Sequence, residues 1–353
     1  MTTVYKNANG GAFDIVVENG RIVHIGKTDA NGIDLGGDRV FAGLIDVHSH
    51  GCIGLDTMDG DALAEMSRFQ AKNGVTAWLP TTMTMDGDSI RRVTNAPLIQ
   101  PENGAQILGF HMEGPYIAEK YKGAQNAAFI QPPALDHFRT FENVKMVTLA
   151  PELDGALEFI RGCDAVVSLG HTACDYETAC RAVDAGALCL THTCNAMPPL
   201  HHRETGPIGA AAEKGVYAQL ICDGLHVHKS MVLALYRMFG VDRLVLISDS
   251  MRATGMGDGE YEFGGQTMTV KDRVARTADG ALAGSTSTLL DCVKTAISFG
   301  ISEADAFAMA SRTPANLLGL NKGQLKVGFD ADFIAVDADY NVTATVIGGK
   351  RIE

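Results

Sequence analysis

Short apolar runs alternate with amphipathic segments along most of this 353-residue sequence, and this alternation limits the folds open to the chain. The segments between the runs have helical periodicity, as in Asp61–Lys72, Tyr176–Ala185 and Lys229–Phe239. Repeats of a strand followed by a helix predict an α/β fold, a parallel (β/α)8 TIM-like barrel, with an open doubly wound sheet as the alternative topology. The eight predicted strands are Leu44–Val47, Val75–Leu79, Ile107–Phe110, Lys145–Leu149, Ala165–Leu169, Ala187–Leu190, Tyr217–Cys222 and Arg243–Ile247.

The two ends of the sequence follow a different pattern, in which apolar residues alternate with period two. Near the N-terminus, Asn19-Gly20 separates two such runs, which is the chemistry of a tight hairpin turn. Residues 324–353 alternate in the same way and are interrupted by Gly and Asp. We therefore predict a small β-sandwich domain formed from both termini, residues 1–42 and 321–353, with the barrel, residues 43–320, inserted between them.

The charge of the chain limits its partners. A formal net charge of −13 argues against a nucleic acid or an anionic membrane, because both would be repelled. A phosphate-bearing ligand would need a local group of basic side chains.

The eight cysteines include no C-x-x-C pair, which predicts reduced, mostly buried thiols. With no apolar run of bilayer-spanning length and no signal-peptide pattern, we expect a cytoplasmic protein.

Side chains of the kind that bind metal ions stand at the ends of the predicted strands. In a (β/α)8 barrel the carboxyl ends of the strands meet at one mouth, where active sites are built. A single histidine in an apolar run is more often an ordinary core residue, and H-x-H alone is a weak signal. Rejecting the whole set, however, would require a separate structural explanation for each member. We expect these residues to converge: His48, His50, Glu113, His171, His192 and Asp249, with His226 as a further histidine.

The residue types suit a catalytic metal centre. Strand alternation sends Asp46, His48 and His50 to one face, so the two imidazoles can share an ion. Glu113 has two oxygens with which to bridge two ions. One or two ions of zinc, or of ferrous iron, fit such nitrogen and oxygen ligands better than calcium or magnesium does. The absence of cysteine from the set favours a catalytic ion, which keeps an open position for water, over a structural one.

Several segments, in order along the chain, resemble the N-acetylglucosamine-6-phosphate deacetylases of the amidohydrolase superfamily. H-x-E-G-P followed by T-H-x-x-N-A-M is specific to that branch, whereas H-x-H alone indicates only the superfamily. The similarity covers nearly the whole chain, including GFDADFIAVD near its end. The segments are GLIDVHSHG, GFHMEGPYI, VTLAPE, SLGHTACDY, THTCNAMPP, CDGLHVHK, LISDSM and DGALAGSTSTL.

The resemblance implies roles for individual residues. Arg203 would hold a phosphate and would reach the site of a neighbouring subunit in a homodimer. Many relatives carry His where Gln125 stands, and Gln cannot become cationic. The ligands of the principal ion would be Glu113, His171 and His192, and those of a second ion His48 and His50, with Asp249 adjoining as metal ligand and catalytic residue. The substrate contacts would be Gln125, Asn195, Ala196, Arg203, His226, Leu282, Ala283 and Gly284.

By the same resemblance, the expected reaction is hydrolysis of the acetamide of N-acetyl-D-glucosamine 6-phosphate in amino-sugar catabolism. A metal-activated water attacks the acetyl group, and Asp249 accepts its proton and returns it to the sugar nitrogen. N-acetylgalactosamine 6-phosphate, which differs in one hydroxyl orientation, is an alternative substrate. A second alternative is an amidohydrolase acting on a cyclic amide or a purine, although many of these use a carbamylated lysine where Glu113 stands. A third is a catalytically silent metal-binding or scaffold protein.

Overall fold

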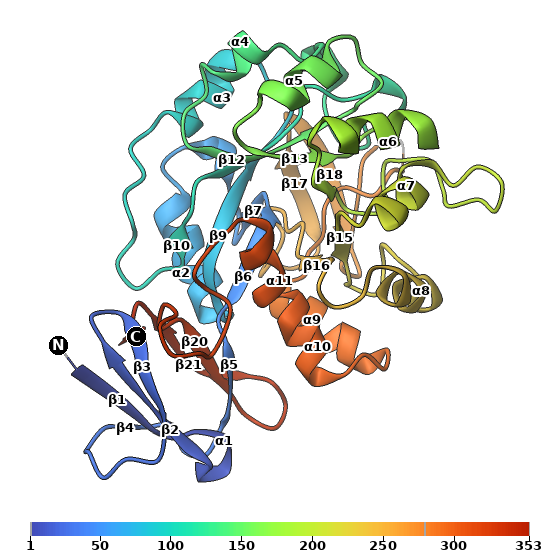
Figure 1. Ribbon diagram of the computed structural model, residues 1–353. Helices are drawn as coiled ribbons and strands as arrows, with labels where there is room; N and C mark the ends of the chain where they lie inside the picture. Colours follow the sequence, from blue (N-terminus) through green and yellow to red (C-terminus); the bar gives the residue numbers. More distant parts are fainter. Residues whose placement is uncertain (1, 279, 353) are drawn as a thin grey trace.

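Eight parallel strands form a nearly closed barrel, as the computed structural model of residues 2–278 and 280–352 shows (Figure 1). Each strand pairs in parallel with the next along the sequence. The prediction of a TIM-like barrel is confirmed, and the alternative of an open sheet is wrong. The strands are β6 (Leu44–Ser49), β9 (Val75–Thr82), β11 (Phe110–Glu113), β12 (Val144–Leu149), β13 (Val166–Leu169), β14 (Cys189–Leu190), β15 (Tyr217–Ile221) and β16 (Leu244–Ile247).

The barrel closes between its last and first strands through single contacts rather than a full ladder. The backbone N–H of Asp249 donates to the carbonyl oxygen of His48 at 2.9 Å. Ser49 and Ser250 form an isolated parallel bridge, and their hydroxyl oxygens lie 2.7 Å apart. The seam of the barrel therefore lies beside two of the expected site residues.

The third barrel strand is interrupted, whereas the sequence predicted one continuous run. The short strand β10 (Gln106–Ile107) and strand β11 both pair with β9, and residues 108–109 separate them. Gly109 adopts a φ of 136°, a backbone conformation that residues with a Cβ rarely adopt. The second part of the strand ends at Glu113, whose side chain is buried.

Helices cover the outside of the barrel, and several of them begin at capping side chains. Asp175 accepts a hydrogen bond from the backbone of Thr178 at the start of α6, and Thr288 forms a capping box with Asp291 at the start of α9. The helices are α2 (Leu63–Lys72), α3 (Gly87–Thr94), α4 (Leu135–Phe138), α5 (Ala156–Gly162), α6 (Tyr176–Ala185), α7 (Gly206–Lys214), α8 (Lys229–Phe239), α9 (Leu289–Ser298), α10 (Glu303–Met309) and α11 (Arg312–Leu317). Short 3₁₀ helices span Thr57–Asp59, Glu119–Tyr121 and Ala127–Phe129.

The barrel interior is filled below the mouth by apolar side chains. Ile45 and Val47 of β6 and Val245 of β16 are fully buried there. Ala315 and Leu317 of α11 belong to the same cluster. Because the interior is packed, polar chemistry is confined to the carboxyl ends of the strands.

Both termini contribute to a small sandwich of two four-stranded sheets beside the barrel (Figure 1). The N-terminal strand β5 pairs with the C-terminal strand β20, which joins the two ends of the chain in one sheet. Asn19 and Gly20 both have positive φ, as the predicted hairpin turn requires. The elements are β1 (Thr2–Asn7), α1 (Ala8–Gly11), β2 (Phe13–Glu18), β3 (Arg21–Gly26), β4 (Ile33–Asp34), β5 (Arg39–Ala42), β20 (Phe333–Val336), β21 (Val342–Ile347) and β22 (Lys350–Arg351).

A three-stranded antiparallel sheet is inserted between β16 and α9, and the sequence analysis did not predict it. Its strands are β17 (Gly259–Phe263), β18 (Gln266–Lys271) and β19 (Val274–Arg276). The side chain of Gln266 donates to the carbonyl oxygen of Ala124, which ties this sheet to the loop after β11. A further hairpin, β7 (Gly51–Cys52) with β8 (Leu55–Asp56), follows the first barrel strand.

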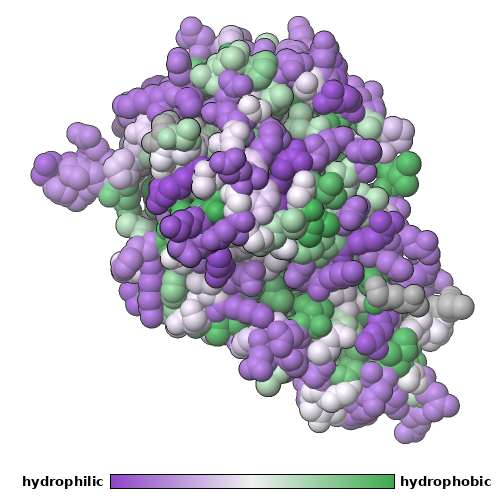
Figure 2. Space-filling view, turned by 180° about the vertical axis from the view of Figure 1, so that it is seen from behind, coloured by the Kyte–Doolittle hydropathy of each residue, from purple (hydrophilic) through white to green (hydrophobic). Residues whose placement is uncertain are grey.

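The molecular surface is mainly hydrophilic on the face shown in Figure 2, where apolar residues form scattered small groups. Among the described residues, no helix is both long and apolar enough to cross a bilayer. All eight cysteines are free, and five of them are buried. The prediction of reduced, mostly buried thiols therefore agrees with the structure.

Candidate active site

Three of the expected site residues occupy equivalent places at the barrel mouth. His171, His192 and Asp249 are each the second residue beyond the end of a barrel strand. Each has a positive φ, of 47°, 28° and 48°, which is uncommon for residues other than glycine. Strained backbone of this kind concentrates at functional sites, where the surrounding structure holds a side chain in a required direction.

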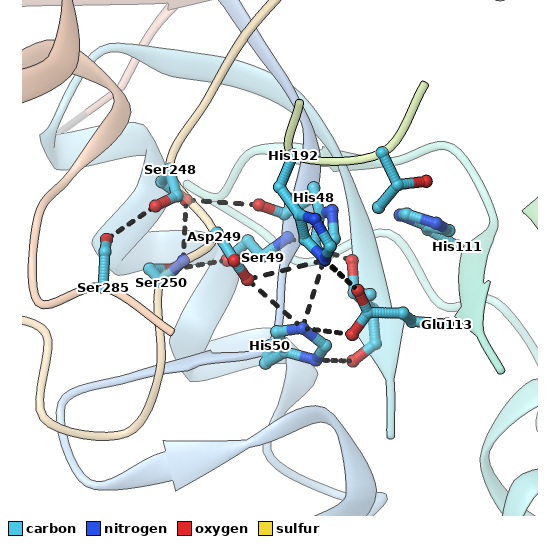
Figure 3. Close-up of polar contacts among 12 residues, drawn as sticks. His48, Ser49, His50, His111, Glu113, His192, Ser248, Asp249, Ser250 and Ser285 are labelled. Atoms are coloured by element: carbon cyan, nitrogen blue, oxygen red, sulfur yellow. Dashed lines mark hydrogen bonds and ion pairs between the residues drawn. The ribbon is translucent and has the colours of Figure 1, made fainter. Parts of the chain in front are cut away.

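The expected metal-binding side chains converge on one point at the mouth, and Figure 3 shows five of them: His48, His50, Glu113, His192 and Asp249. Nε2 of His171 and Nε2 of His192 lie 3.1 and 3.0 Å from Oε1 of Glu113. On the other side of this carboxylate, Nε2 of His50 lies 3.2 Å from Oε2. Glu113 therefore stands between the two pairs of histidines, as a bridging ligand would.

Asp249 completes the group from the seam of the barrel. Its Oδ1 lies 3.4 Å from Nε2 of both His48 and His50. Nε2 of His48 is also 3.4 Å from Oε1 of Glu113. All six residues predicted from strand-end positions are thus brought together by the fold.

The outer nitrogens of the imidazoles hold three of the four rings in place. Nδ1 of His48 donates to Oε1 of Gln219 at 3.0 Å, and Nδ1 of His50 donates to the carbonyl oxygen of Thr81 at 3.2 Å. Nδ1 of His171 donates to the carbonyl oxygen of Tyr121 at 2.8 Å. A proton on Nδ1 leaves Nε2 with a free lone pair directed into the cluster, the usual arrangement of a metal-binding histidine.

A divalent cation fits this set of atoms. Two groups of ligand atoms lie within 4.8 Å of one another, one formed by His48, His50 and Glu113 and the other by Glu113, His171 and His192. Nε2 atoms face each other at 3.2 Å in the first group and 3.1 Å in the second. Unprotonated nitrogens at this separation repel one another, and a cation bound between them would remove the repulsion.

The charges of the cluster also favour a cation. Burial raises the pKa of Glu113, but the charges of His48 and His171 outweigh burial and hold this pKa well below its usual range. Burial likewise opposes ionisation of Asp249, yet His48 and His50 bring its pKa to about 2. Two buried carboxylates are therefore ionised at neutral pH, and a cation bound at the site could replace the histidine protons as their positive partner.

A network of hydroxyl groups surrounds Ser248, the residue that precedes Asp249 (Figure 3). The Ser248 hydroxyl donates to Oδ2 of Asp46 at 2.5 Å, and the Ser285 hydroxyl donates to the carbonyl oxygen of Ser248 at 2.6 Å. Asp46 also accepts from the backbone N–H of His48 at 3.2 Å. Asp46 therefore ties the first and last strands together beneath the cluster.

A cavity of 360 Å³ opens onto the cluster, a size typical of small-ligand sites. Most of the expected substrate contacts line it, but two do not. Ala283 is fully buried in an apolar cluster, and Arg203 lines a separate cavity with His201. The expected residues that line the first cavity are Gln125, Asn195, Ala196, His226, Leu282 and Gly284.

His226 is oriented by a neighbouring carboxylate. Nδ1–H of His226 donates to Oδ2 of Asp223 at 2.7 Å, and Oδ1 of Asp223 accepts from the backbone N–H groups of Leu225 and His226. Burial lowers the pKa of His226, but the hydrogen bond and charge of Asp223 outweigh burial and raise it. The raised pKa favours the imidazolium form, in which the remaining nitrogen, Nε2, can donate a hydrogen bond to a ligand.

Some lining residues gave no sequence signal. Lys120 is the single lysine or arginine among the described residues that line the cavity, and it resembles any exposed lysine in the sequence. Phe263, from the inserted sheet, lines the cavity and places its ring 5.2 Å from that of His50. Only the three-dimensional position of that sheet brings Phe263 to the mouth.

Comparisons with known proteins place the chain in a family. The model of the amidohydrolase family matches residues 39–352. An N-acetylglucosamine-6-phosphate deacetylase from Vibrio furnissii is 39% identical over 96% of this chain and 90% of that protein. An N-acetylgalactosamine-6-phosphate deacetylase from Escherichia coli O157:H7 is 38% identical over 87% of this chain and 85% of that protein. The crystal structure of an N-acetylglucosamine-6-phosphate deacetylase from Pasteurella multocida superposes with a TM-score of 0.93, at 28% identity over 99% of both chains.

The chain belongs to the amidohydrolase family. It is therefore a hydrolase, and the alternative of a catalytically silent scaffold loses its support. Amidohydrolases generally use a divalent metal ion, and the buried His and Glu cluster at the barrel mouth is of the type that binds one.

Proposed function

We propose that this amidohydrolase removes the acetyl group from N-acetyl-D-glucosamine 6-phosphate, giving acetate and glucosamine 6-phosphate. One structural observation carries the proposal: four histidines, Glu113 and Asp249 converge at the wall of a cavity sized for a small ligand. The similarity to deacetylases of this type over most of the chain supports the substrate class.

We assign the principal metal site to Glu113, His171 and His192, and a second site to His48 and His50, with zinc or ferrous iron as the ion. A divalent ion held by these residues would activate a water for attack and would stabilise negative charge on the acetyl oxygen. Asp249 stands where it can adjoin the second site, since its carboxylate lies 3.4 Å from both histidines of that pair.

Asp249 moves the proton in the proposed reaction. Its low pKa keeps the carboxylate ionised, so it accepts a proton as the water oxygen bonds to the acetyl carbon. When the carbon–nitrogen bond breaks, the same carboxyl returns the proton to the sugar nitrogen. His226, oriented by Asp223, donates a hydrogen bond to the acetyl oxygen as negative charge develops there.

The phosphate is held by basic groups in the proposed complex. Lys120 lines the cavity of its own chain, whereas Arg203 lies outside that cavity. We therefore assign Arg203 to the site of a second copy in a homodimer, where its planar guanidinium suits a phosphate.

N-acetylgalactosamine 6-phosphate is the second candidate substrate. The similarity to the Escherichia coli O157:H7 enzyme, at 38% identity, is nearly as high as that to the Vibrio furnissii enzyme, at 39%. The two substrates differ in one hydroxyl orientation and present the same acetamide and phosphate to the site.

Acetate release from purified, metal-loaded protein tests the proposal. The substrates are N-acetylglucosamine 6-phosphate, its galactosamine epimer and unphosphorylated N-acetylglucosamine. We expect rapid release from the first, slower release from the epimer and very little from the sugar without phosphate. Equal release with and without phosphate would contradict the substrate class, and no release from any of the three would contradict the deacetylase proposal.

A further inference from the structure

Gln125 is buried beside the metal-binding cluster, and its amide is bonded within the protein. The side chain is 3% exposed. Its Nε2 donates to Oε2 of Glu113 at 2.6 Å and lies 3.9 Å from the sulfur of Met83. Its Oε1 accepts from the backbone N–H of Thr84 at 2.7 Å. Both ends of the amide are therefore engaged before any ligand enters the cavity.

The orientation of this amide is fixed by chemistry. The two ends of a glutamine amide have nearly the same shape, so their assignment depends on their partners. The backbone N–H of Thr84 can only donate, so the oxygen of Gln125 must face it. The nitrogen must then face Oε2 of Glu113, which lies 2.6 Å away.

This hydrogen bond determines how Glu113 presents its two oxygens. Oε2 receives the amide of Gln125, and Oε1 lies 3.0 and 3.1 Å from Nε2 of His192 and His171. Without that donor the carboxylate would be free to rotate about its terminal bond, because its other close partners are the imidazole nitrogens that would bind the ion. The donor therefore keeps one oxygen directed at the His171 and His192 pair.

We propose that Gln125 is a positioning residue for Glu113, and that it raises the affinity of the site for a divalent metal ion rather than contacting the sugar phosphate. The inference rests on the proposed metal site but does not depend on the identity of the substrate. Hydrogen-bond partners of metal ligands commonly contribute a factor of about 10–100 to metal affinity. We expect an effect of that size here.

The variant Gln125→Met tests the proposal, because methionine retains the length of the side chain and removes the amide. Zinc affinity is measured on the metal-depleted protein by competition with a coloured chelator, with no sugar present. We expect the Kd for zinc to rise by about 10–100-fold. At saturating zinc, KM for the phosphosugar should stay unchanged. Gln125→Ala serves as a second variant if methionine prevents folding, which circular dichroism would reveal.

Gln266→Met is the matched control. Gln266 also donates through Nε2 to the loop after β11, at the carbonyl oxygen of Ala124, but it makes no contact with a metal-binding side chain. This variant should bind zinc as tightly as the unsubstituted chain. Unchanged zinc affinity in folded Gln125→Met or Gln125→Ala would overturn the proposal, and a raised KM with unchanged zinc affinity would assign Gln125 to substrate binding. Because zinc affinity is measured without sugar, its outcome is independent of the deacetylase assay.

Discussion

At the scale of single residues, Asp249 joins the seam of the barrel to the metal-binding cluster. Its backbone contacts His48 and Ser285, while its carboxylate faces His48 and His50. The backbone thus holds the residue in the left-handed region, where Asp and Asn are tolerated better than other residues with a Cβ. These backbone contacts hold Asp249 in position, so its carboxylate remains available to face His48 and His50.

Replacing Asp249 with Asn tests its proposed role. Asn keeps the size of the side chain and tolerates the same backbone conformation, but its amide cannot accept a proton. We expect kcat to fall by about 10²–10⁴-fold while the fold and zinc content are retained. Steady-state kinetics give kcat, and circular dichroism and elemental analysis are the controls. Near-normal turnover would refute the assignment.

The histidines predict how metal content depends on pH. Burial lowers the pKa of His50, but Asp249 and Glu113 outweigh burial and raise it to about 10 in the metal-free protein, and the pKa of His48 is raised as well. Burial lowers the pKa of His192, so this ring is already neutral at neutral pH. A metal ion must therefore displace protons from His48 and His50, but not from His192.

Metal occupancy should therefore rise with pH. We expect about one ion per chain after equilibration at about pH 6 and additional metal at about pH 9, because metal binding competes with protons at the second site. Elemental analysis of protein equilibrated in zinc buffers of each pH measures the ratio. Equal occupancy at both pH values would show that protons do not control the second site.

At the scale of elements, the strand ends were the most predictable part of the molecule. Apolar runs in the sequence report burial, and buried parallel strands of a barrel end at a common mouth, so the convergence of His48, Glu113 and His192 followed from position alone. The sequence pattern did not reveal the positive φ of three site residues or the break at Gly109, since these depend on packing between distant segments.

The inserted sheet β17–β19 was missed for a related reason. Its strands are mostly exposed and short, so they lack the apolar run by which the barrel strands were found. Phe263 and the loop at Leu282 reach the cavity only because this sheet folds over the mouth. The sequence also showed no sign of the hydrogen bonds of Gln125. One partner, Thr84, lies 41 residues away along the chain, and the other, Glu113, lies at the end of strand β11.

Gly284 gives a test of how the loop after the inserted sheet supports Asp249. Gly284 has a φ of 60°, and a Cβ added there would lie 3.1 Å from the carbonyl oxygen of Asp249. Gly284→Ala should lower kcat because the backbone of Asp249 must shift, and should also reduce the melting temperature. Steady-state kinetics and thermal unfolding measure the two effects.

Gly280→Ala provides the comparison for that variant. Gly280 also has a positive φ, of 89°, but an added Cβ would meet no atom within 4 Å. This substitution should cost about 1–2 kcal/mol of backbone strain and leave kcat unchanged. If Gly284→Ala also left kcat unchanged, the loop would have no influence on the position of Asp249.

At the scale of the whole molecule, the proposed homodimer can be tested by combining two inactive chains. Arg203→Ala lacks the proposed phosphate contact, and Asp249→Asn lacks the proton acceptor. If Arg203 acts in the site of its partner, a mixed dimer contains one site with both residues intact, and deacetylase activity should return on mixing the two proteins. Each variant incubated alone is the control. Absence of recovery, once subunit exchange is shown by labelled chains, would place Arg203 outside the site.

The central claim is that side chains from distant strands of the barrel surround one catalytic metal centre. Anomalous X-ray diffraction from crystals of active, zinc-loaded protein, measured on both sides of the zinc absorption edge, tests it most directly. The account predicts an anomalous peak bonded to Glu113, His171 and His192, next to the cavity that Asp249 lines. A peak located only elsewhere in the active protein would contradict it.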